Sequence, residues 1–253
     1  MKRIIIPKEM GPELAEEIGI HIGDGSLLIR PESGHYEYYV CLSIEEKDYM
    51  KYVCRIIHSL YSLKVKPKER PLDGSLYTLF SSKQLAMYKL SLGLPSGDKG
   101  QITIPKVVFD SKFVLDCIRG IFDTDGSLTF KKKYKDVHYY PVIHIASISK
   151  DLILQMADIL SKFRFTYYTY LDEKKGSSTG TIIIEHSLFI SGRKSLDLWM
   201  GLIGSSSPIH TSKYLIWKRF GFCPPKTTLS TRRSILEGKV DPVIFERDAG
   251  GEI

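Results

Sequence analysis

The chain has 253 residues, with 36 Lys and Arg against 29 Asp and Glu, which gives a net charge of +7 and a pI near 9.0. A hydrophobic content of 43% and a charged content of 26% are usual for globular proteins, and they exclude disordered and collagen-like chains. No apolar run approaches the roughly 20 residues of a membrane-spanning helix. The three apolar residues before Pro7 are too few for a secretory signal core. Scattered cysteines without metal-ligand spacing indicate reduced thiols, so we expect a cytoplasmic protein that makes no membrane contact.

The first hundred residues predict a regular succession of elements. Apolar residues at helical spacing predict a helix over 12–24 that stops at Gly25. Two β-rich stretches around a Pro-Glu-Ser-Gly turn predict a hairpin, and a second hairpin is expected around Pro71-Leu-Asp-Gly. In chain order the remaining expected elements are strands at 26–30 and 36–44, a helix at 47–60, strands at 63–70 and 76–80, and a helix at 83–92.

The second hundred residues predict the same succession. A helix at 112–125 is followed by strands at 127–133 and 139–147, a helix at 150–162, strands at 165–172 and 180–190, and a helix at 193–202. We therefore expect an α+β protein of two αββαββα repeats with mixed antiparallel sheets. The expected boundaries are a first repeat at 1–98, a linker at 99–108, a second repeat at 109–222 and a basic tail at 223–253 with a helix near 228–237.

The sequence itself repeats along the two halves. Each half contains a Gly, four residues and then Asp-Gly-Ser-Leu, which aligns Asp24 with Asp125 at an offset of 101 residues. Further downstream, Ser43 matches Ser147 at an offset of 104, and Leu79 matches Leu188 at an offset of 109. An offset that grows slowly is typical of a duplicated domain with loop insertions.

Small residues mark one face of each motif helix. Gly19 and Gly23 are four apart on the first helix, and Gly120 and Thr124 are four apart on the second, so each pair shares a face. Small residues at this spacing allow two helix backbones to approach closely. If the helices pack along these strips, Asp24 and Asp125 meet at their C-terminal ends.

Two carboxylates beside two helix C-termini repel one another unless a cation is present. Hard oxygen ligands of this kind suit Mg²⁺, which keeps several waters and accepts phosphate oxygens. A single Asp-Gly after a helix is usually only a turn. Finding it twice, each time after a Gly-containing apolar helix and before a hairpin, favours a metal site for phosphodiester hydrolysis over a duplicated structural motif.

The two motif segments, Glu17-Ile-Gly-Ile-His-Ile-Gly-Asp24-Gly25 and Ile118-Arg-Gly-Ile-Phe-Asp-Thr-Asp125-Gly126, resemble the paired motifs of the LAGLIDADG homing endonucleases. The second segment is the closer match. The first departs from the pattern at Ile22, where the family has Asp, and at His21, which we interpret as a helix-packing residue. The resemblance extends from about residue 12 to 222, and the segment from Pro208 to Lys218 is similar to archaeal-type members.

The resemblance implies a monomer with pseudo-two-fold symmetry that binds a long double-stranded DNA target and cuts both strands with Mg²⁺ or Mn²⁺. It implies that Asp24 and Asp125 are catalytic and ligate metal, assisted by the backbone carbonyls of Gly23 and Thr124. A basic residue is expected near each metal, and Lys99 and Lys213 follow the last helix of each repeat. The alternative interpretation is that each lysine is only a solvated surface residue.

The two sheets together are expected to form a DNA-binding saddle, because one strand face packs on helices while the other is free to meet DNA. A lysine on such a face more often contacts a phosphate than a base. The basic and tyrosine side chains expected on these strands are Arg30, Tyr36, Tyr38, Lys64, Lys66, Lys68, Arg70, Lys131, Lys133, Lys135, Tyr139, Arg164, Tyr167 and Tyr170.

Other functions remain open at this point. A non-cleaving DNA-binding regulator, or a maturase that binds intron RNA, would use the same scaffold. The chain lacks the terminal nucleophile and His-Asn of a splicing intein, so a free-standing protein is expected. A structural protein with no nucleic-acid partner is the weakest interpretation, given the basic, tyrosine-rich strands.

Overall fold

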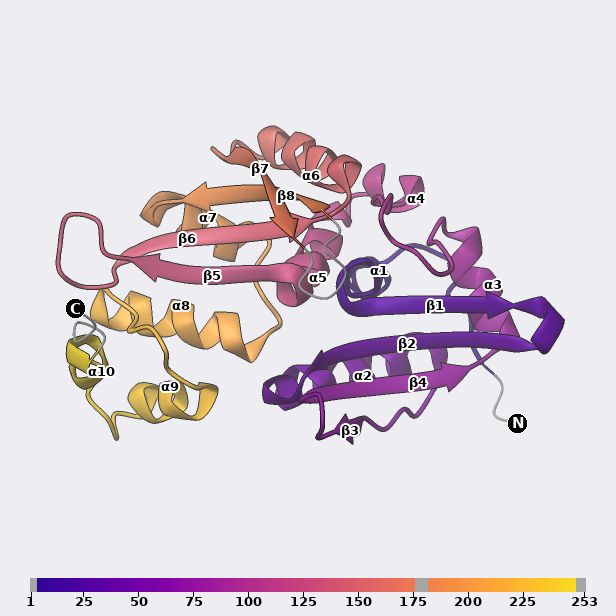
Figure 1. Ribbon diagram of the computed structural model, residues 1–253, viewed down its shortest axis with the longest axis horizontal. Helices are drawn as coiled ribbons and strands as arrows, with labels where there is room; N and C mark the ends of the chain where they lie inside the picture. Colours follow the sequence, from indigo (N-terminus) through magenta and orange to yellow (C-terminus); the bar gives the residue numbers. More distant parts are fainter. Residues whose placement is uncertain (1–3, 176–181, 249–253) are drawn as a thin grey trace.

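The computed structural model describes residues 4–175 and 182–248. Two four-stranded antiparallel sheets lie on either side of a central pair of helices (Figure 1). Their strand orders, β1-β2-β4-β3 and β5-β6-β8-β7, are the same when counted within each half. The fold predicted from the sequence, an α+β protein with two repeats of one topology, is confirmed.

The first half runs from α1 to α3, with a short 3₁₀ turn before and after β2. Its helices and strands are α1 (Pro12–Asp24), β1 (Gly25–Arg30), β2 (His35–Ser43), α2 (Lys47–Tyr61), β3 (Lys68–Arg70), β4 (Ser75–Ser81) and α3 (Lys83–Ser91). The strand predicted at 63–70 is wrong in length, because pairing with β4 covers only β3. Pro67 has no N–H to donate to a strand ladder and comes directly before the paired residues.

The second half repeats this order and continues beyond it. Its elements are α4 (Lys106–Phe109), α5 (Val114–Asp125), β5 (Gly126–Lys131), β6 (Tyr140–Ser147), α6 (Lys150–Lys162), β7 (Tyr168–Lys175), β8 (Ile182–Ser191), α7 (Arg193–Leu202), α8 (Pro208–Phe220), α9 (Leu229–Leu236) and α10 (Val243–Asp248). The helix predicted near 228–237 is confirmed as α9. Helices α4, α8 and α10 were not predicted.

The end of the predicted second repeat, from residue 208 onward, forms a packed helix that was not predicted. Pro208 occupies the first turn of α8, where its missing N–H costs no helical hydrogen bond. Ile216 and Trp217 of this helix are buried, and the Trp217 Nε1 donates to the backbone carbonyl of Tyr139 at 2.8 Å. Helix α8 is therefore part of the second half's core.

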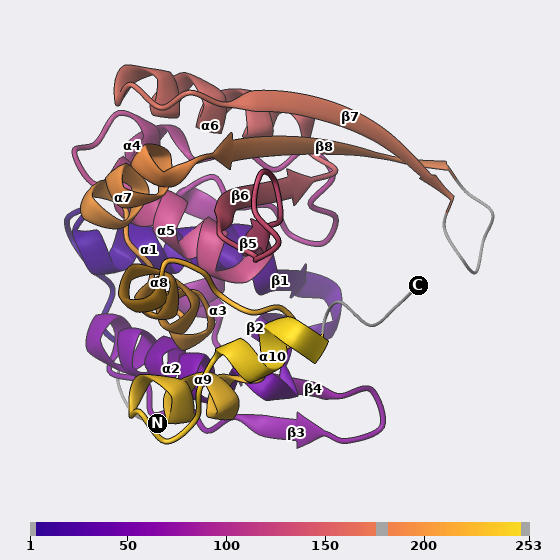
Figure 2. The ribbon, with the colours of Figure 1, turned by 90° about the vertical axis from the view of Figure 1, so that its left-hand side faces the viewer.

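The arrangement in space leaves one side of each sheet free. Figure 2 shows most helices on the left of the molecule, with the β7–β8 and β3–β4 hairpins extending to the right above and below. The larger hydrophobic core joins α1, α5, the second sheet and α8, while a second core lies between the first sheet and α2. Among the described helices, none is long and apolar enough to cross a membrane.

Candidate active site

The centre of the molecule is the contact between α1 and α5, where the two backbones touch through glycines. A Cβ placed on Gly19 would lie 2.0 Å from the carbonyl oxygen of Cys117, and one placed on Gly120 would lie 2.2 Å from that of Glu16. Since real Cβ atoms never approach that closely, only glycine permits this helix separation. The structure thus places the predicted small-residue strips of the two helices face to face.

The Asp-Gly step at the end of each helix turns the chain sharply into a strand. A Cβ on Gly25 would lie 2.5 Å from the Cα of His21, and one on Gly126 would lie 2.4 Å from the carbonyl oxygen of Phe122. Both glycines have an extended backbone, so close approach and not a left-handed conformation is what requires them. The turn fixes the preceding aspartate at the helix end.

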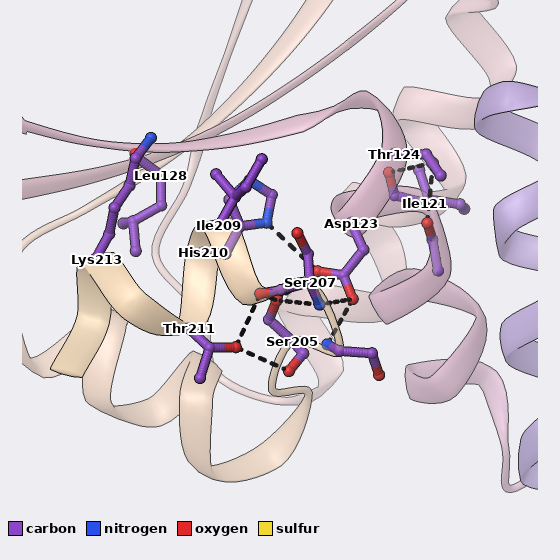
Figure 3. Close-up of polar contacts among 12 residues, drawn as sticks. Ile121, Asp123, Thr124, Leu128, Ser205, Ser207, Ile209, His210, Thr211 and Lys213 are labelled. Atoms are coloured by element: carbon purple, nitrogen blue, oxygen red, sulfur yellow. Dashed lines mark hydrogen bonds and ion pairs between the residues drawn. The ribbon is translucent and has the colours of Figure 1, made fainter. Parts of the chain in front are cut away.

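The two motif aspartates meet at this seam. A Cβ on Gly23 would lie 3.3 Å from the carboxyl carbon of Asp125 and 2.0 Å from the hydroxyl oxygen of Thr124. The end of α1 therefore lies directly against the end of α5. The Thr124 hydroxyl donates to the carbonyls of Gly120 and Ile121 at 2.9 and 3.1 Å, so it is turned back onto its own helix (Figure 3).

The electrostatics of the seam disfavour two free negative charges. Burial, followed by the nearby charges of Asp125 and Glu46, raises the pKa of Asp24 from 3.8 to about 7. Burial also raises the pKa of Asp125 from 3.8 to about 6, although this residue keeps substantial contact with solvent. A bound cation would favour the ionised form of both carboxylates, against the burial that raises both pKa values and the negative neighbours that raise that of Asp24.

Lys99 is the cation that the structure places at the seam. Its Nζ donates to the carbonyl oxygen of Ile22 at 3.1 Å and to that of Gly23. Burial lowers the pKa of Lys99, while Asp125 and Asp24 act in the opposite direction, and Lys99 in turn lowers the pKa of both aspartates. The carbonyl of Gly23, predicted as a metal ligand, is engaged by this lysine.

Lys213, predicted to occupy the equivalent place in the second half, makes a different contact from that of Lys99. Helix α8 directs its Nζ onto the carbonyl oxygen of Leu128, 2.9 Å away (Figure 3). Leu128 is three strand residues beyond Asp125, which corresponds to roughly 10 Å of extended chain. The charged neighbours that influence the pKa of Lys213 are Arg232 and Cys223, whereas burial is the main cause of its lowered value.

Asp123 holds the start of α8 in place, a role that the sequence did not indicate. Its carboxylate accepts hydrogen bonds from the backbone N–H of Ser206 at 2.6 Å and of Ser207 at 3.1 Å, and from the Ser205 hydroxyl at 2.5 Å (Figure 3). His210 Nδ1 lies 3.3 Å from the same carboxylate. Backbone N–H groups ahead of a helix need such an acceptor when they are buried.

A second buried acid links the two halves across the helix pair. Glu16 of α1 is 2% exposed and forms a 2.7 Å ion pair with Arg119 of α5. Ser206 donates to Glu16 at 2.7 Å and Tyr52 donates at 3.0 Å. Arg119 also pairs with Asp116 on its own helix. The residues before α8 are therefore tied to α1 as well as to α5.

A third buried acid belongs to the first half alone. Glu17 accepts hydrogen bonds from Lys89 of α3, from the Tyr38 hydroxyl at 2.7 Å and from the Tyr61 hydroxyl at 3.0 Å. His21, expected to pack between helices, is fully buried and stacks on the Tyr38 ring with 5.3 Å between centroids. Burial lowers its pKa, which is consistent with a packing role for a neutral imidazole.

Strand register decides which predicted DNA-contacting residues lie on the free sheet faces. The register places five of these residues on the sheet face that points away from the helices. They are Arg30, Lys68, Arg70, Lys131 and Tyr170. Three others, Lys133, Lys135 and Tyr139, lie in the connection between β5 and β6, where Lys133 Nζ is 4.3 Å from the centroid of the Tyr140 ring. These residues form the basic part of the open surface.

The remaining predicted DNA contacts lie outside the free faces of the strands. Tyr38 is 1% exposed, and Tyr36 shares its strand face and lies under Lys83 of α3, so the alternation was assigned to the wrong face. Lys64 and Lys66 precede β3, and Lys64 lies beside α2. Arg164 and Tyr167 precede β7, and the Tyr167 hydroxyl accepts from Ser161 of α6.

The same register brings other side chains to the open faces. In the first sheet Arg70 lies over the rings of Tyr77 and Tyr39, with 4.1 Å to the Tyr77 centroid. In the second sheet Phe189 stacks between His144 and Tyr168 at 4.3 and 4.8 Å. Because neighbouring strand residues point to opposite faces, assigning the open face of β2 one residue later would have selected Tyr39 in place of Tyr38.

The donor set at the seam fits a hard divalent cation. It contains carboxylate and carbonyl oxygens and no sulfur or imidazole ligand, the chemistry that Mg²⁺ and Mn²⁺ accept. Over residues 4–175 and 182–248 there is no group of three or more His, Cys, Asp or Glu side chains that would enclose a metal completely. Two protein carboxylates leave coordination positions for water and substrate oxygens.

Comparison with known proteins confirms the resemblance. Residues 112–204 match the family model of the LAGLIDADG-like domain. Among solved structures, the homing endonuclease I-DmoI in complex with DNA and Ca is 17% identical with a TM-score of 0.53, over 77% of this chain and 91% of that one. I-DmoI with DNA and Mn is 19% identical with a TM-score of 0.52, over 77% and 97%.

A third structure, an I-DmoI variant with its target DNA nicked in the coding strand in the presence of Mn, is 17% identical with a TM-score of 0.54, over 78% of this chain and 97% of that one. At these identities the likeness establishes the fold. No curated protein matches the sequence significantly.

Proposed function

We propose that this chain, with the fold of the LAGLIDADG homing endonucleases, is a site-specific endonuclease that cuts both strands of double-stranded DNA with a divalent metal. The observation that carries the proposal is the meeting of Asp24 and Asp125 at the ends of two touching helices, between two open sheet faces. The fold likeness to I-DmoI in its DNA complexes with Ca and Mn supports it. A monomer supplies both halves of such a site.

The open sheet faces would bind the duplex. Arg30, Lys68, Arg70 and Lys131 would contact backbone phosphates, which contribute affinity without sequence information. Aromatic and polar side chains on the same faces, such as Tyr77 and His144, would contact base edges in the major groove. With the duplex bound in this way, the seam would lie under the stretch of DNA between the two sheets.

Asp24 and Asp125 would hold Mg²⁺ or Mn²⁺, and the bound metal would supply an activated water and charge relief at the scissile phosphate. The two carboxylates would fix that metal at the ends of α1 and α5. Lys99 is anchored on the end of α1 by hydrogen bonds to the carbonyls of Ile22 and Gly23. Because its side chain is already held there, its ammonium would remain close to the reacting phosphate. It would stabilise negative charge that develops there.

The test is cleavage-site selection from a randomised duplex library in the presence of Mg²⁺ or Mn²⁺. Asp24→Asn and Asp125→Asn are each expected to lower double-strand cleavage by at least ~100-fold, because electrostatic groups at the reacting centre contribute on that order. DNA affinity should stay nearly unchanged. Asp158→Asn on the outer helix α6 is the matched control, since Asp158 is exposed and forms a surface ion pair with Lys162.

Unchanged cutting by either seam variant would overturn the assignment of the metal site. Tight binding of a selected duplex with no cut product would instead support a non-cleaving DNA-binding regulator. Preferential binding of a structured RNA over every duplex tested would support a maturase.

A further inference from the structure

A cavity of about 660 Å³ lies away from the seam, beside β5 and between the two halves. Helices α8 and α9 and the segment 223–228 form one side of it, and residues 44–48 at the start of α2 form the other. Figures 1 and 2 show α9 next to α8 and facing the start of α2. The first half has no counterpart of α9, so the cavity has no equivalent across the pseudo-symmetry.

Two cationic side chains of the second half line this cavity with unused donors. Lys213 donates one ammonium N–H to the Leu128 carbonyl, and its ammonium group has two further N–H donors. Arg232 is 4% exposed and donates through Nε to Ser212 and through Nη1 to Thr227, whereas its Nη2 makes no hydrogen bond to the described residues. The two charges lie close enough for Arg232 to depress the pKa of Lys213.

The acidic residues around the cavity do not neutralise this pair. Asp48 is held by Arg233 at 2.6 Å and by Lys51 at 2.8 Å. Glu45 acts on Arg232 through space, but within the described parts of the chain no carboxylate lies within 4 Å of either cation. Buried cations without a paired acid are rare, because desolvation of an uncompensated charge is costly.

The start of α9 adds a further preference for negative charge. Thr228, Leu229 and Ser230 all line the cavity, and they belong to the N-terminal turn of the helix, where backbone N–H groups carry partial positive charge. The Thr228 hydroxyl caps Thr231 N–H at 3.1 Å. Two cations with free donors and a helix N-terminus thus face one space of ligand size.

We propose that this cavity binds a phosphate group, held by Lys213 and Arg232 at the start of α9. Apolar side chains, including Leu128, Phe130 and Ile209, line the remainder and would exclude water around the anion. The phosphate has two possible sources, a free phosphate anion or the backbone of bound DNA. Thr129 also lines the cavity and points to the open face of the second sheet, so a DNA backbone that follows β5 would pass its mouth.

The first measurement is the thermal stability of the full chain without DNA, as inorganic phosphate replaces chloride at constant ionic strength. A saturable rise in Tm is expected for the wild type. Lys213→Gln should abolish the rise. Ser230→Glu should abolish it as well, since a carboxylate at the second position of α9 repels an anion while favouring the helix itself. Lys218→Gln, on the outer side of α8 and paired with Asp197, should retain it.

The second measurement is the salt dependence of DNA binding, which depends on the proposed function. If the phosphate belongs to the DNA backbone, Lys213→Gln and Ser230→Glu should reduce the slope of log K against log salt by about 1, the value for one lost phosphate contact. If the slope is unchanged while the Tm response is lost, the site takes free phosphate.

The proposal is overturned if phosphate gives no saturable Tm rise in the wild type and the salt slope is unchanged in both variants. It is also overturned if all four proteins respond equally to phosphate. The Tm measurement uses neither DNA nor metal. Its result therefore tests the phosphate site even if the proposed nuclease function is wrong.

Discussion

Helices α1 and α5 end in the same Asp-Gly step, but the two ends are held by different parts of the molecule. At the end of α5, Asp123 captures the start of α8 through the N–H groups of Ser206 and Ser207. The aligned position of α1 is Ile22, which is buried and offers only its carbonyl, and that carbonyl accepts from Lys99. Symmetry is therefore kept where the backbones touch and where the carboxylates meet, while the support around each end has diverged.

The symmetric part should be the more fragile. Gly120→Ala and Gly19→Ala are each expected to destabilise the fold by more than about 3 kcal/mol, because the added methyl meets a carbonyl oxygen near 2 Å and the helices must separate. Urea unfolding followed by circular dichroism measures this. Gly201→Ala in α7 is the matched control, since its Cβ meets nothing within 4 Å and should stabilise by ~0.5–1 kcal/mol. A small effect at either seam glycine would contradict the close packing.

The asymmetric support of α5 should be the next most costly to remove. Asp123→Ala leaves the Ser206 N–H ahead of α8 without its acceptor, whereas the Ser207 N–H still donates to the Ser205 hydroxyl at 3.1 Å, and the substitution is expected to cost about 1–3 kcal/mol. The same unfolding measurement applies, and Asp110→Ala, an exposed residue paired with Lys106 on α4, serves as the control with an effect under about 0.5 kcal/mol. Equal losses in the two variants would mean that the α8 cap contributes little.

The paired carboxylates should make stability depend on pH in the absence of metal. The folded pKa of Asp24 is about 7 against an ordinary 3.8, so its contribution to stability is fully present below pH 4 and is lost as the pH rises through 7. Asp24→Asn lacks this loss and should be more stable than the wild type at pH 8 by about 1–2 kcal/mol, with little difference at pH 4. Adding Mg²⁺ should stabilise only the wild type at pH 8. A difference that does not change with pH would show that the fold does not raise the pKa of Asp24.

The smallest effect is expected where the last helices join the first half. Arg233 of α9 pairs with Asp48 of α2 at 2.6 Å, and the arginine side chain is half exposed. Arg233→Gln should cost less than about 1 kcal/mol, as exposed ion pairs do, and the loss should shrink in high salt. A double-mutant cycle with Asp48→Asn isolates this pair. A coupling well above 1 kcal/mol would mean that α9 fixes the relative position of the halves.

Much of the fold and the centre of the site follow from the sequence. Each half has two small residues four apart directly before its Asp-Gly step. This repeated pattern predicted both the helix contact and the meeting of Asp24 with Asp125. Backbone approach is a local property of residue size, so a single sequence records it. Lys99 could also be located, because it follows the last helix of its half at a short distance.

Other features depend on tertiary context that local patterns do not record. Alternation shows that β2 has two faces but not which one meets helices, so Tyr38 was placed on the wrong side and Tyr39 was missed. The buried acids Glu16, Glu17 and Asp123 resemble ordinary helix-surface residues, because their partners lie on other elements. The contact of Lys213 with Leu128 was not predicted, because no helix was expected at 208–220 and the packing of α8 fixes the direction of this side chain.

The Glu16–Arg119 pair makes the two halves non-interchangeable. Under the alignment of Asp24 with Asp125, Arg119 corresponds to Ile18, and Glu16 corresponds to Cys117. A dimer assembled from two copies of the first half would bury two copies of Glu16 with isoleucine where the arginine should be. A chimera that joins one half to a foreign half must therefore exchange positions 16 and 119 together, and the duplicated ancestor must have had a different seam.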